Sequence, residues 1–546
     1  MQFSNKQVLI VEDQRPFLLL LKGLMHSMGV SDVVTKSSAE QAVSLSKKHK
    51  FDIIVCDLHL GADNKNGYEL IEELRTRQLI NPTAVFILIS ADSARPVVLG
   101  SIDRRPDDFL IKPFSQVQLK SRIVRAWQKR QFLKDAYRLI EQREYSSAIE
   151  HINSLLASPS HYKGHCEQLL IELYWQVDQP DKALDVLKEY INGKPVLWAQ
   201  VALGKTYLAL NENEKAISVA KRIIKKNRFN ADAHDVIAQA NQALKRGEIA
   251  IEAIKEAIKL SPFSLTRHFN ACTIARENND LVLAAASSQA IWDLSKRTVN
   301  QNSLHWCGII RSLLDVAEFS DDKKQRNKYQ QEALLTLQRG KFDDHLQRVD
   351  REFDVEIFGK IVNARVSAID GKLIDAKKHL SESQSALENK YPELPTAFIP
   401  DSINVMYKLG EYDDALELAK ILENRQSKLD VNSTLMLAEQ AKKAEENLAN
   451  YQQFNREGIS HYQKQDYERA KASFALAQGY APVNTGVSLN LLQCLLQIAK
   501  TQDTVEMKII NECKRLFKLI DDMNLKPPYQ EKYINLREEL AKYIGF

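Results

Sequence analysis

The chain has 546 residues, of which 44% are hydrophobic and 27% are charged, a composition typical of a globular protein with several domains. Its 75 basic and 71 acidic residues leave a net charge of +4, so charge favours neither a nucleic acid nor an anionic membrane as a partner. The six cysteines are scattered without a CxxC motif, which indicates free thiols in a reducing compartment. No apolar run approaches the roughly 20 residues that a bilayer requires. We therefore expect a cytoplasmic protein.

The first part of the chain, residues 1 to 126, alternates short apolar runs with amphipathic stretches. The apolar runs are QVLIV, DVVT, FDIIVC, AVFILIS and DDFLI. Strand and helix alternating five times predict an α/β domain, with a five-stranded parallel sheet covered by helices on both faces. In such a sheet, the residues that carry chemistry gather at the carboxyl ends of the strands.

Polar side chains of complementary chemistry stand at these predicted strand ends. They are Glu12 and Asp13 after the first strand, Asp57 after the third, Ser90 after the fourth and Lys112 after the fifth. Three converging carboxylates repel one another and require a cation, and Mg²⁺ prefers oxygen ligands completed by phosphate. Asp57 offers a carboxylate nucleophile, Ser90 a hydroxyl donor and Lys112 a point charge for a phosphoryl oxygen. The sequence therefore predicts phosphoryl transfer to Asp57.

The motifs VLIVEDQ, DLHLG, NGYELI, FILISA and DDFLIKPF resemble the receiver domain of two-component response regulators, whose fold is CheY-like, or flavodoxin-like. The resemblance implies that Asp57 is the phosphoacceptor. It also implies that Asp57, Asp13 and Glu12 bind Mg²⁺ together with the backbone carbonyl of His59. The implied phosphodonor is a histidine kinase or a phosphotransfer protein. We expect the chain to hydrolyse its own acyl phosphate and, with no separate catalytic domain in view, not to be an enzyme otherwise.

The resemblance also assigns three switch residues. Ser90 is implied as the switch hydroxyl, and Lys112, in its KPF setting, as the lysine that pairs with the phosphoryl group. Phe109, three residues before Lys112, is implied as the switch aromatic that rotates on phosphorylation.

Two departures from the family pattern fall on or near the face that receivers use to signal. Gly61 and a longer loop stand where the family usually has a proline after the phosphoacceptor. Arg104-Arg105-Pro106 replace the usual small residues before the fifth strand, and Pro96 lies in the region of the fourth helix. Neither change removes a chemical group, but both weigh against the family's common dimer geometry.

Beyond residue 126, glycine and proline become rare, and small or apolar residues pair at a spacing of twelve. The pairs are Ala136/Ala148, Ile171/Ala183, Gly204/Ala216, Ala238/Ala250 and Cys272/Ala284, and their second members lie 33 to 35 residues apart. A small residue from each of two antiparallel helices can then meet at the crossing, and the helix pair repeats. Segments 198–224 and 455–482 resemble the tetratricopeptide repeat (TPR). The resemblance implies an all-α superhelix with a concave groove for a peptide or protein ligand.

These patterns predict five parts. They are a receiver (1–126), a TPR arm of about five repeats (127–299), an atypical helical segment (300–350), further TPR-like repeats (351–482) and C-terminal capping helices (483–546). In the second arm, the pairs Ala364/Ala376, Ile403/Ala415 and Gly458/Ala470 continue the spacing at looser intervals. The segment 300–350 breaks the period, and we interpret it as a helix pair that divides the superhelix into two arms.

Other candidate sites have simpler explanations. His161, His165 and Cys166 are close enough to suggest a metal site, but they lack an evident fourth ligand. Trp198 holds a position in the repeat pattern that predicts core packing. The basic cluster on one predicted helix is better explained as a solvated face than as a nucleic-acid site; it consists of Lys221, Arg222, Lys225, Lys226 and Arg228.

The sequence thus predicts a response regulator whose output is a TPR interaction platform. Phosphorylation at Asp57 would control the binding of a partner protein, such as a sensor kinase or a second response regulator. The order of receiver and repeats resembles that of VieB-type auxiliary regulators. One alternative is an adaptor that delivers a client to a protease or motor, which a phosphorylation-dependent client would reveal. Another is a transcriptional regulator that uses the repeats as a scaffold, which a salt-dependent shift of DNA would reveal.

Overall fold

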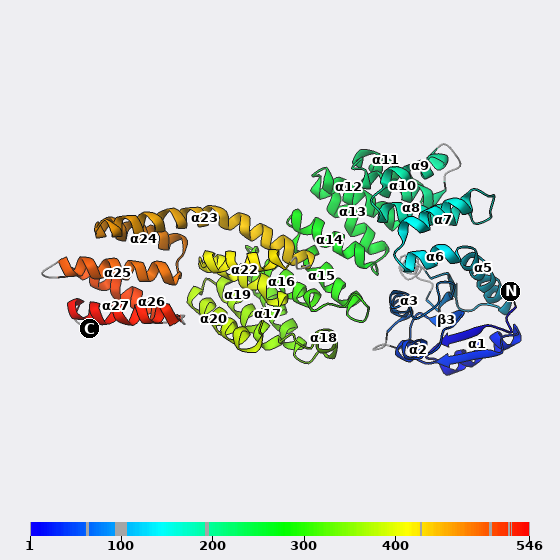
Figure 1. Cartoon of the computed structure of the whole chain (residues 1–546), viewed down its shortest axis with the longest axis horizontal. Coiled ribbons are helices and arrows are strands. Elements are labelled where there is room, and N and C mark those ends of the chain that lie inside the picture. Colours follow the sequence, from blue (N-terminus) through cyan, green and yellow to red (C-terminus); the bar gives the residue numbers. More distant parts are fainter. Residues whose placement is uncertain are drawn as a thin grey trace. The chain divides into compact units, whose positions relative to one another are not determined.

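The structure is a computed structural model that describes residues 2–61, 65–92, 106–191, 196–425, 429–501, 505–521, 523, 525 and 527–544. The chain divides into two compact units, Met1–Asp280 with Ala290–Gln301 and Leu281–Gln289 with Asn302–Phe546. Figure 1 follows the chain through an α/β domain into a long series of helices. The predicted departures at Pro96, Arg104 and Arg105 lie outside the described residues.

The first unit begins with a five-stranded sheet in the order β2-β1-β3-β4-β5, in which all neighbours are parallel. The strands are β1 (Gln7–Val11), β2 (Asp32–Lys36), β3 (Ile53–Asp57), β4 (Val85–Ser90) and β5 (Asp108–Ile111). The helices around them are α1 (Arg15–Ser27), α2 (Ala39–Ser46), α3 (Gly67–Thr76) and α5 (Gln116–Phe132). This order of elements confirms the predicted α/β fold.

Successive strand residues face two different hydrophobic layers. Val8 and Ile10 pack in the layer that contains α1 and α5, whereas Leu9 and Val11 pack in the layer that contains α2 and α3. Because both faces of the sheet are covered, its central strands are apolar along their whole length. Every residue of β3 is buried, up to and including Asp57. The first polar side chain of β3 therefore stands at the end of the strand.

The receiver continues into the helical region without a flexible linker. Leu133, which is 1% exposed, is both the C-cap of α5 and the N-cap of α6. The helices of this region are α6 (Lys134–Glu141), α7 (Tyr145–Leu156), α8 (Lys163–Gln176), α9 (Pro180–Ile191), α10 (Leu197–Ala209), α11 (Asn213–Lys226), α12 (Ala231–Ala243), α13 (Gly247–Leu260), α14 (Leu265–Glu277) and α15 (Leu281–Ser295). Consecutive helices from α6 to α13 pack in pairs.

Two periodic features confirm the repeat architecture. All members of the predicted twelve-residue pairs between Ala136 and Ala284 are buried. A left-handed turn residue also recurs between consecutive helices of this region, with φ between 54° and 62°; these residues are Arg143, Asp178, Asn211, Lys245 and Asn279. None of them is a glycine, so each turn is imposed by the packing of its two helices.

The second unit is helical in the part that the structure describes. Its elements are α16 (Ser303–Glu318), α17 (Lys323–Gly340), α18 (Asp344–Val349), α19 (Val355–Ile369), α20 (Leu373–Lys390), η1 (Thr396–Phe398), α21 (Ile399–Leu409), α22 (Tyr412–Asn424), α23 (Val431–Gln463), α24 (Tyr467–Tyr480), α25 (Thr485–Thr501), α26 (Met507–Asp521) and α27 (Pro527–Ile544). The pairs predicted from Ala364 to Ala470 are buried here too. Gly410 has φ 77° and a Cβ there would lie 2.4 Å from Ala481 Cα, so two interhelical turns pack directly.

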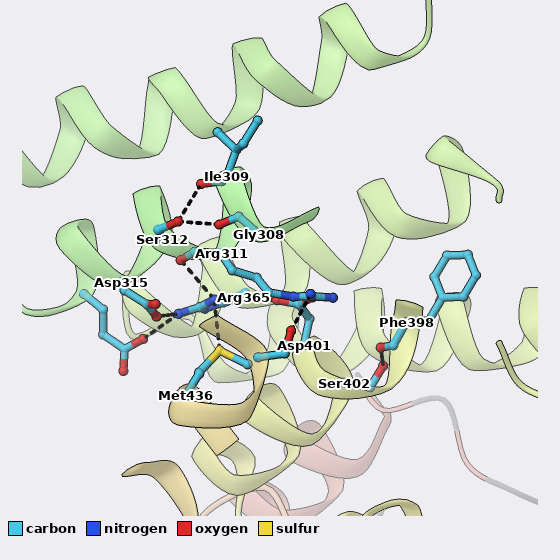
Figure 2. Close-up of polar contacts among 12 residues, drawn as sticks. Gly308, Ile309, Arg311, Ser312, Asp315, Arg365, Phe398, Asp401, Ser402 and Met436 are labelled. Atoms are coloured by element: carbon cyan, nitrogen blue, oxygen red, sulfur yellow. Dashed lines mark hydrogen bonds and ion pairs between the residues drawn. The ribbon is translucent and has the colours of Figure 1, made fainter. Parts of the chain in front are cut away.

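A buried network of charges joins helices of the second unit (Figure 2). Arg311 on α16 is fully buried and donates to Asp401 on α21 at 2.7 Å and to Asp430, the cap of α23, at 3.0 Å. Arg365 on α19 is also fully buried and pairs with Asp315 on α16. The network explains why α16, within the segment expected to be atypical, lacks the repeat period, since polar groups as well as apolar ones are buried on it.

Candidate functional site

Acidic residues from two neighbouring strands converge at the carboxyl edge of the sheet. Glu12 and Asp13 directly follow β1, and Asp57 ends β3, which pairs with β1. One oxygen from each of the three carboxylates lies within 4.8 Å of the other two. Glu12 is fully buried, Asp57 is 5% exposed and Asp13 is exposed. The structure thus brings these three predicted residues together at a site that is open on the Asp13 side.

Lys112 supplies the positive charge of this site. Its Nζ donates a hydrogen bond to Glu12 Oε2 at 2.9 Å and lies 3.3 Å from Asp57 Oδ1. The same Nζ lies 4.0 Å from the centre of the Phe17 ring. The backbone N–H of Lys112 donates to the Ser90 carbonyl at 2.8 Å, which fixes the end of β5 beside that of β4. One amine is therefore shared by two carboxylates.

Burial determines the electrostatics of these acids. It raises the pKa of Asp57 above its ordinary value, and the nearby Lys112 offsets this only in part. Burial likewise raises the pKa of Glu12. Lys112 approaches Asp57 Oδ1 as an ion-pair partner at 3.3 Å, but this buried oxygen accepts no hydrogen bond of good geometry. A second cation at the site would satisfy this oxygen and keep the three carboxylates ionised together.

The donor set fits Mg²⁺. Hard carboxylate oxygens from Glu12, Asp13 and Asp57 would hold the ion, and the exposed side of Asp13 leaves room for water and phosphate oxygens. When bound, the ion would neutralise charge on a phosphoryl group. His59, whose carbonyl the sequence implied as a further ligand, is exposed two residues beyond the end of β3.

The two remaining predicted site residues stand on the strands beyond β3. Ser90 ends β4 and is fully buried, and its Oγ accepts the Asp92 N–H at 3.0 Å. Phe109 lies in β5, is half-buried and packs against the hydrophobic layer of α2 and α3. Ser90 lies at the end of β4, which pairs with the strand of Phe109, so a change in the hydrogen bonding of the Ser90 hydroxyl would occur on the neighbouring strand.

Two glycines shape the loop after Asp57. Gly61 has φ 95°, a left-handed conformation that a proline cannot adopt, which gives a physical reason for the departure from the usual family residue. Gly67 opens α3, and a Cβ there would lie 2.7 Å from the Asp57 carbonyl oxygen. The side chain of Asn66 caps α3 in a capping box with Glu69. The start of α3 thus packs directly on the strand end that carries Asp57.

Family models match both parts of the chain. The response regulator receiver domain matches residues 8–124, and a tetratricopeptide repeat model matches residues 201–264. The chemotaxis protein CheY of Thermotoga maritima is 31% identical over 125 residues, which cover 23% of this chain and 97% of CheY. The chain belongs to the response regulators with a CheY-like receiver domain. More particularly, it is a two-component response regulator whose receiver is followed by TPR repeats.

Other relatives are similar over about a quarter of this chain. The transcriptional regulatory protein YvrH of Bacillus subtilis is 29% identical over 129 residues, or 24% of this chain and 52% of YvrH. The chain spans about half of YvrH and a quarter of the AlgB regulator of Pseudomonas putida. The solved receiver domain of the Francisella response regulator 1452 is 23% identical, with a TM-score of 0.21, and covers 23% of this chain and 98% of that chain.

A groove in the first helical region is a second candidate site. It has a volume of about 520 Å³ and lies between α8, α10 and α12. Trp175, Leu197, Trp198 and Val201 form its apolar part, and Leu197 is 45% exposed. Trp198 also contacts Tyr190 edge to face at 4.9 Å. The prediction that Trp198 is a core residue is therefore incomplete, because this half-buried side chain also lines the groove.

Sequence reasoning missed Trp175, although its spacing from Ile171 places both on one face of α8. The His161, His165 and Cys166 cluster does not form a metal site by geometry: among the described residues, the group able to hold an ion is Glu12, Asp13 and Asp57. The basic cluster at the end of α11 and at Arg228 just beyond it is exposed, as predicted for a solvated face. In the described part of the chain, no helix is both long and apolar enough to cross a membrane.

Proposed function

We propose that a histidine kinase or phosphotransfer protein phosphorylates Asp57, and that this modification controls a protein interaction of the TPR repeats. The geometry around Asp57 supports the first half of the proposal: a carboxylate at a strand end lies beside a shared lysine and two further acids. Asp57 acts as the nucleophile toward phosphate, with Lys112 pairing with the phosphoryl oxygens and Ser90 responding as the switch hydroxyl. We retain Phe109 as the switch aromatic and the His59 carbonyl as a metal ligand in this proposal.

The surface beside the site supports docking of a protein phosphodonor. The Phe17 ring on α1 contacts the Phe114 ring before α5 edge to face at 6.1 Å, so these two segments lie side by side. Apolar residues on them are unusually exposed: Leu20 is 54% exposed and Val117 is 76% exposed. Exposed apolar groups next to a reactive centre are suited to a transient protein contact. A phosphodonor that covers them would bring its phosphoryl group to Asp57.

The observation that carries the second half of the proposal is the direct packing of the receiver on the first repeats. The Phe132 ring on α5 lies 5.0 Å from the Tyr162 ring before α8. On the neighbouring side, Gln78, which follows α3, donates through Nε2 to the Glu141 carbonyl of α6 at 3.1 Å. A phosphorylation-dependent shift of α3 or α5 would therefore move the first repeats. The size of the effect on their conformational equilibrium is set by how much more phosphorylation stabilises one state than the other.

The groove between α8, α10 and α12 is the surface that we assign to the partner. Its aromatic and aliphatic lining suits the apolar side chains of a bound peptide or helix. We retain the predicted domain limits in this proposal: the receiver (1–126) is followed by a first arm (127–299) and by the segments 300–350, 351–482 and 483–546. A sensor kinase or a second response regulator is the partner class that we favour, as in VieB-type regulators.

The proposal is tested by phosphorylating the full chain with acetyl phosphate and Mg²⁺ and measuring its intact mass and hydrogen exchange. The wild type should gain one phosphoryl group and change exchange in α6 to α8, whereas Asp57→Asn should do neither. Asp52→Asn is the matched control, because Asp52 lies before β3 at the opposite edge of the sheet. Phosphorylation without any change in the repeats would refute the coupling.

A further inference from the structure

A pocket of about 290 Å³ lies in the second unit. Its walls come from α20, the start of α22, the second half of α23, the start of α25 and α27. Four acidic residues line it, against one lysine; these are Glu388, Glu411, Asp413 and Asp414 against Lys377. We call this the acidic pocket. Tyr451 and Tyr529 add two aromatic rings to its lining.

The lysine of the acidic pocket is engaged in hydrogen bonds within the protein. Lys377 is 8% exposed, and its Nζ donates to the Glu411 carboxylate, to the Val483 carbonyl at 2.5 Å and to Thr485 Oγ1 at 2.7 Å. Asn484 Nδ2 donates to the other Glu411 oxygen at 3.3 Å. The Lys377–Glu411 pair therefore forms a fixed, neutral floor, and the remaining carboxylates give the rim its negative charge.

The rim of the acidic pocket offers hydrogen-bond acceptors without matching donors. Asp413 is exposed and accepts a long hydrogen bond of 3.4 Å from the Tyr451 hydroxyl. Glu388 is exposed and has no ion-pair partner among the residues that the structure describes. Asn455 Oδ1, in the wall, is buried and receives no hydrogen bond. A ligand complementary to these groups must be positively charged and must donate several hydrogen bonds.

The arrangement of the carboxylates argues against a metal ion as the ligand. In the described part of the chain, the acids of this pocket do not converge closely enough to hold a metal ion, unlike those at Asp57. An organic cation that donates several hydrogen bonds is therefore a better candidate than a metal ion. A guanidinium group presents five donors in a planar fork, matches carboxylates in pairs and stacks on aromatic rings. Tyr529, which is 42% exposed, offers such a ring at the rim.

We propose that the acidic pocket binds an arginine side chain in an extended segment of a partner protein. The inference rests on the proposed role of the repeats as a protein platform and adds the chemistry of the partner. Arginine is favoured over lysine because a guanidinium group offers five donors against three and can stack on the ring of Tyr529 at the rim. The pocket thus contributes selectivity for a basic segment, whereas the apolar groove of the first arm contributes hydrophobic contact.

The test is a fluorescence-anisotropy titration of the full chain with a labelled peptide Gly-Ser-Arg-Gly-Arg-Ser-Gly. Matched peptides carry lysine or the neutral isostere citrulline. The double variant Glu388→Gln with Asp413→Asn should weaken binding of the arginine peptide by about tenfold or more. The control Glu417→Gln with Glu423→Gln changes net charge equally at exposed positions of α22 outside the pocket lining, and should weaken it less than about twofold. Thermal unfolding of both variants verifies folding, and Glu388→Gln alone provides a second variant at an exposed position.

Preference for arginine over citrulline, lost only in the pocket variant, would establish the inference. Equal losses in both double variants, equal binding of citrulline, or no binding of the arginine peptide would overturn it. Repeating the titration with Mg²⁺ and beryllofluoride separates the two proposals. Pocket-specific binding that is identical in both states, and that accompanies unchanged exchange in α6 to α8, would leave the pocket assignment standing and refute phosphorylation control.

Discussion

Arg130 and Asp107 form a buried ion pair at the edge of the sheet opposite Asp57, with Arg130 Nε 2.7 Å from Asp107 Oδ1. Arg130 is 8% exposed and also donates to the Pro82 carbonyl at 2.8 Å. Its guanidinium lies 4.5 Å from the Tyr137 ring on α6. Although burial acts in the other direction, Arg130 and Arg75 hold the pKa of Asp107 below its ordinary value. The pair therefore joins β5, α5 and the first repeat helix.

Replacing Asp107 with asparagine should destabilise this junction by about 3 to 5 kcal/mol, because the Arg130 guanidinium would remain buried without its carboxylate partner. Hydrogen exchange of the α5 and α6 amides along a urea series measures the loss. The control is Arg125→Gln, since Arg125 also pairs with an aspartate, Asp108, but is 66% exposed. It should cost about 1 kcal/mol or less. Equal effects of the two substitutions would contradict the assigned role of the buried pair.

Gly67→Ala should impair phosphorylation at Asp57. A Cβ at this position would lie 2.6 Å from Leu88 Cδ1 as well as 2.7 Å from the Asp57 carbonyl oxygen, so backbone at the site must move. We expect a slower gain of phosphoryl mass from acetyl phosphate. Gly23→Ala is the matched control, because Gly23 lies inside α1 with nothing within 4 Å of its Cβ position. It should stabilise the helix by about 0.5 to 1 kcal/mol without slowing phosphorylation. An unchanged rate for Gly67→Ala would show that the contact is unimportant.

Asp401→Asn should strongly destabilise the second unit. Asp401 is 2% exposed and accepts from Arg311 at 2.7 Å, with Arg365 at 3.6 Å (Figure 2). Removing its charge leaves both guanidinium groups with one partner fewer, at a cost of about 3 to 5 kcal/mol. Urea unfolding followed by hydrogen exchange of the α16 and α21 amides measures this loss of stability. Lys341→Gln, which breaks the exposed pair with Glu356, should change the same exchange by about 1 kcal/mol or less. A loss of stability as small as that of Lys341→Gln would contradict the prediction, because the remaining groups would then compensate for the lost carboxylate charge.

Stability of the second unit should rise between pH 8 and pH 10. Burial lowers the pKa of Lys408 to about 8, although Glu318 lies 2.6 Å from its Nζ. The ordinary lysine value is about 10.4, so the unfolded chain binds the proton more tightly and stability increases as the folded group loses it. At pH 9.5 the gain over pH 7.5 should be about 2 kcal/mol relative to Lys408→Met, which lacks this titration. If the free energy of unfolding changed equally in the two proteins between these pH values, the assignment would be contradicted.

The receiver was accessible to sequence reasoning because its site residues are local to strand ends. Asp57 follows an apolar run, and parallel pairing alone brings it to Glu12. The buried charges of Arg311 and Arg365 were not predictable, because their acidic partners lie 36 to 119 residues away and follow no periodic pattern. The acidic pocket was not predicted for the same reason. Its lining comes from helices distant in sequence, and each acidic residue, taken alone, is typical of a solvent-exposed surface.

The measurement that tests the central claim most directly is quantitative pull-down mass spectrometry with the full chain as bait. Wild type with Mg²⁺ and beryllofluoride is compared with Asp57→Ala under the same conditions, and Asp52→Asn serves as the control for an acid lost elsewhere in the receiver. The account predicts a partner protein whose recovery differs between wild type and Asp57→Ala but not between wild type and Asp52→Asn. Identical partner sets for all three proteins would contradict control of the repeats by phosphorylation.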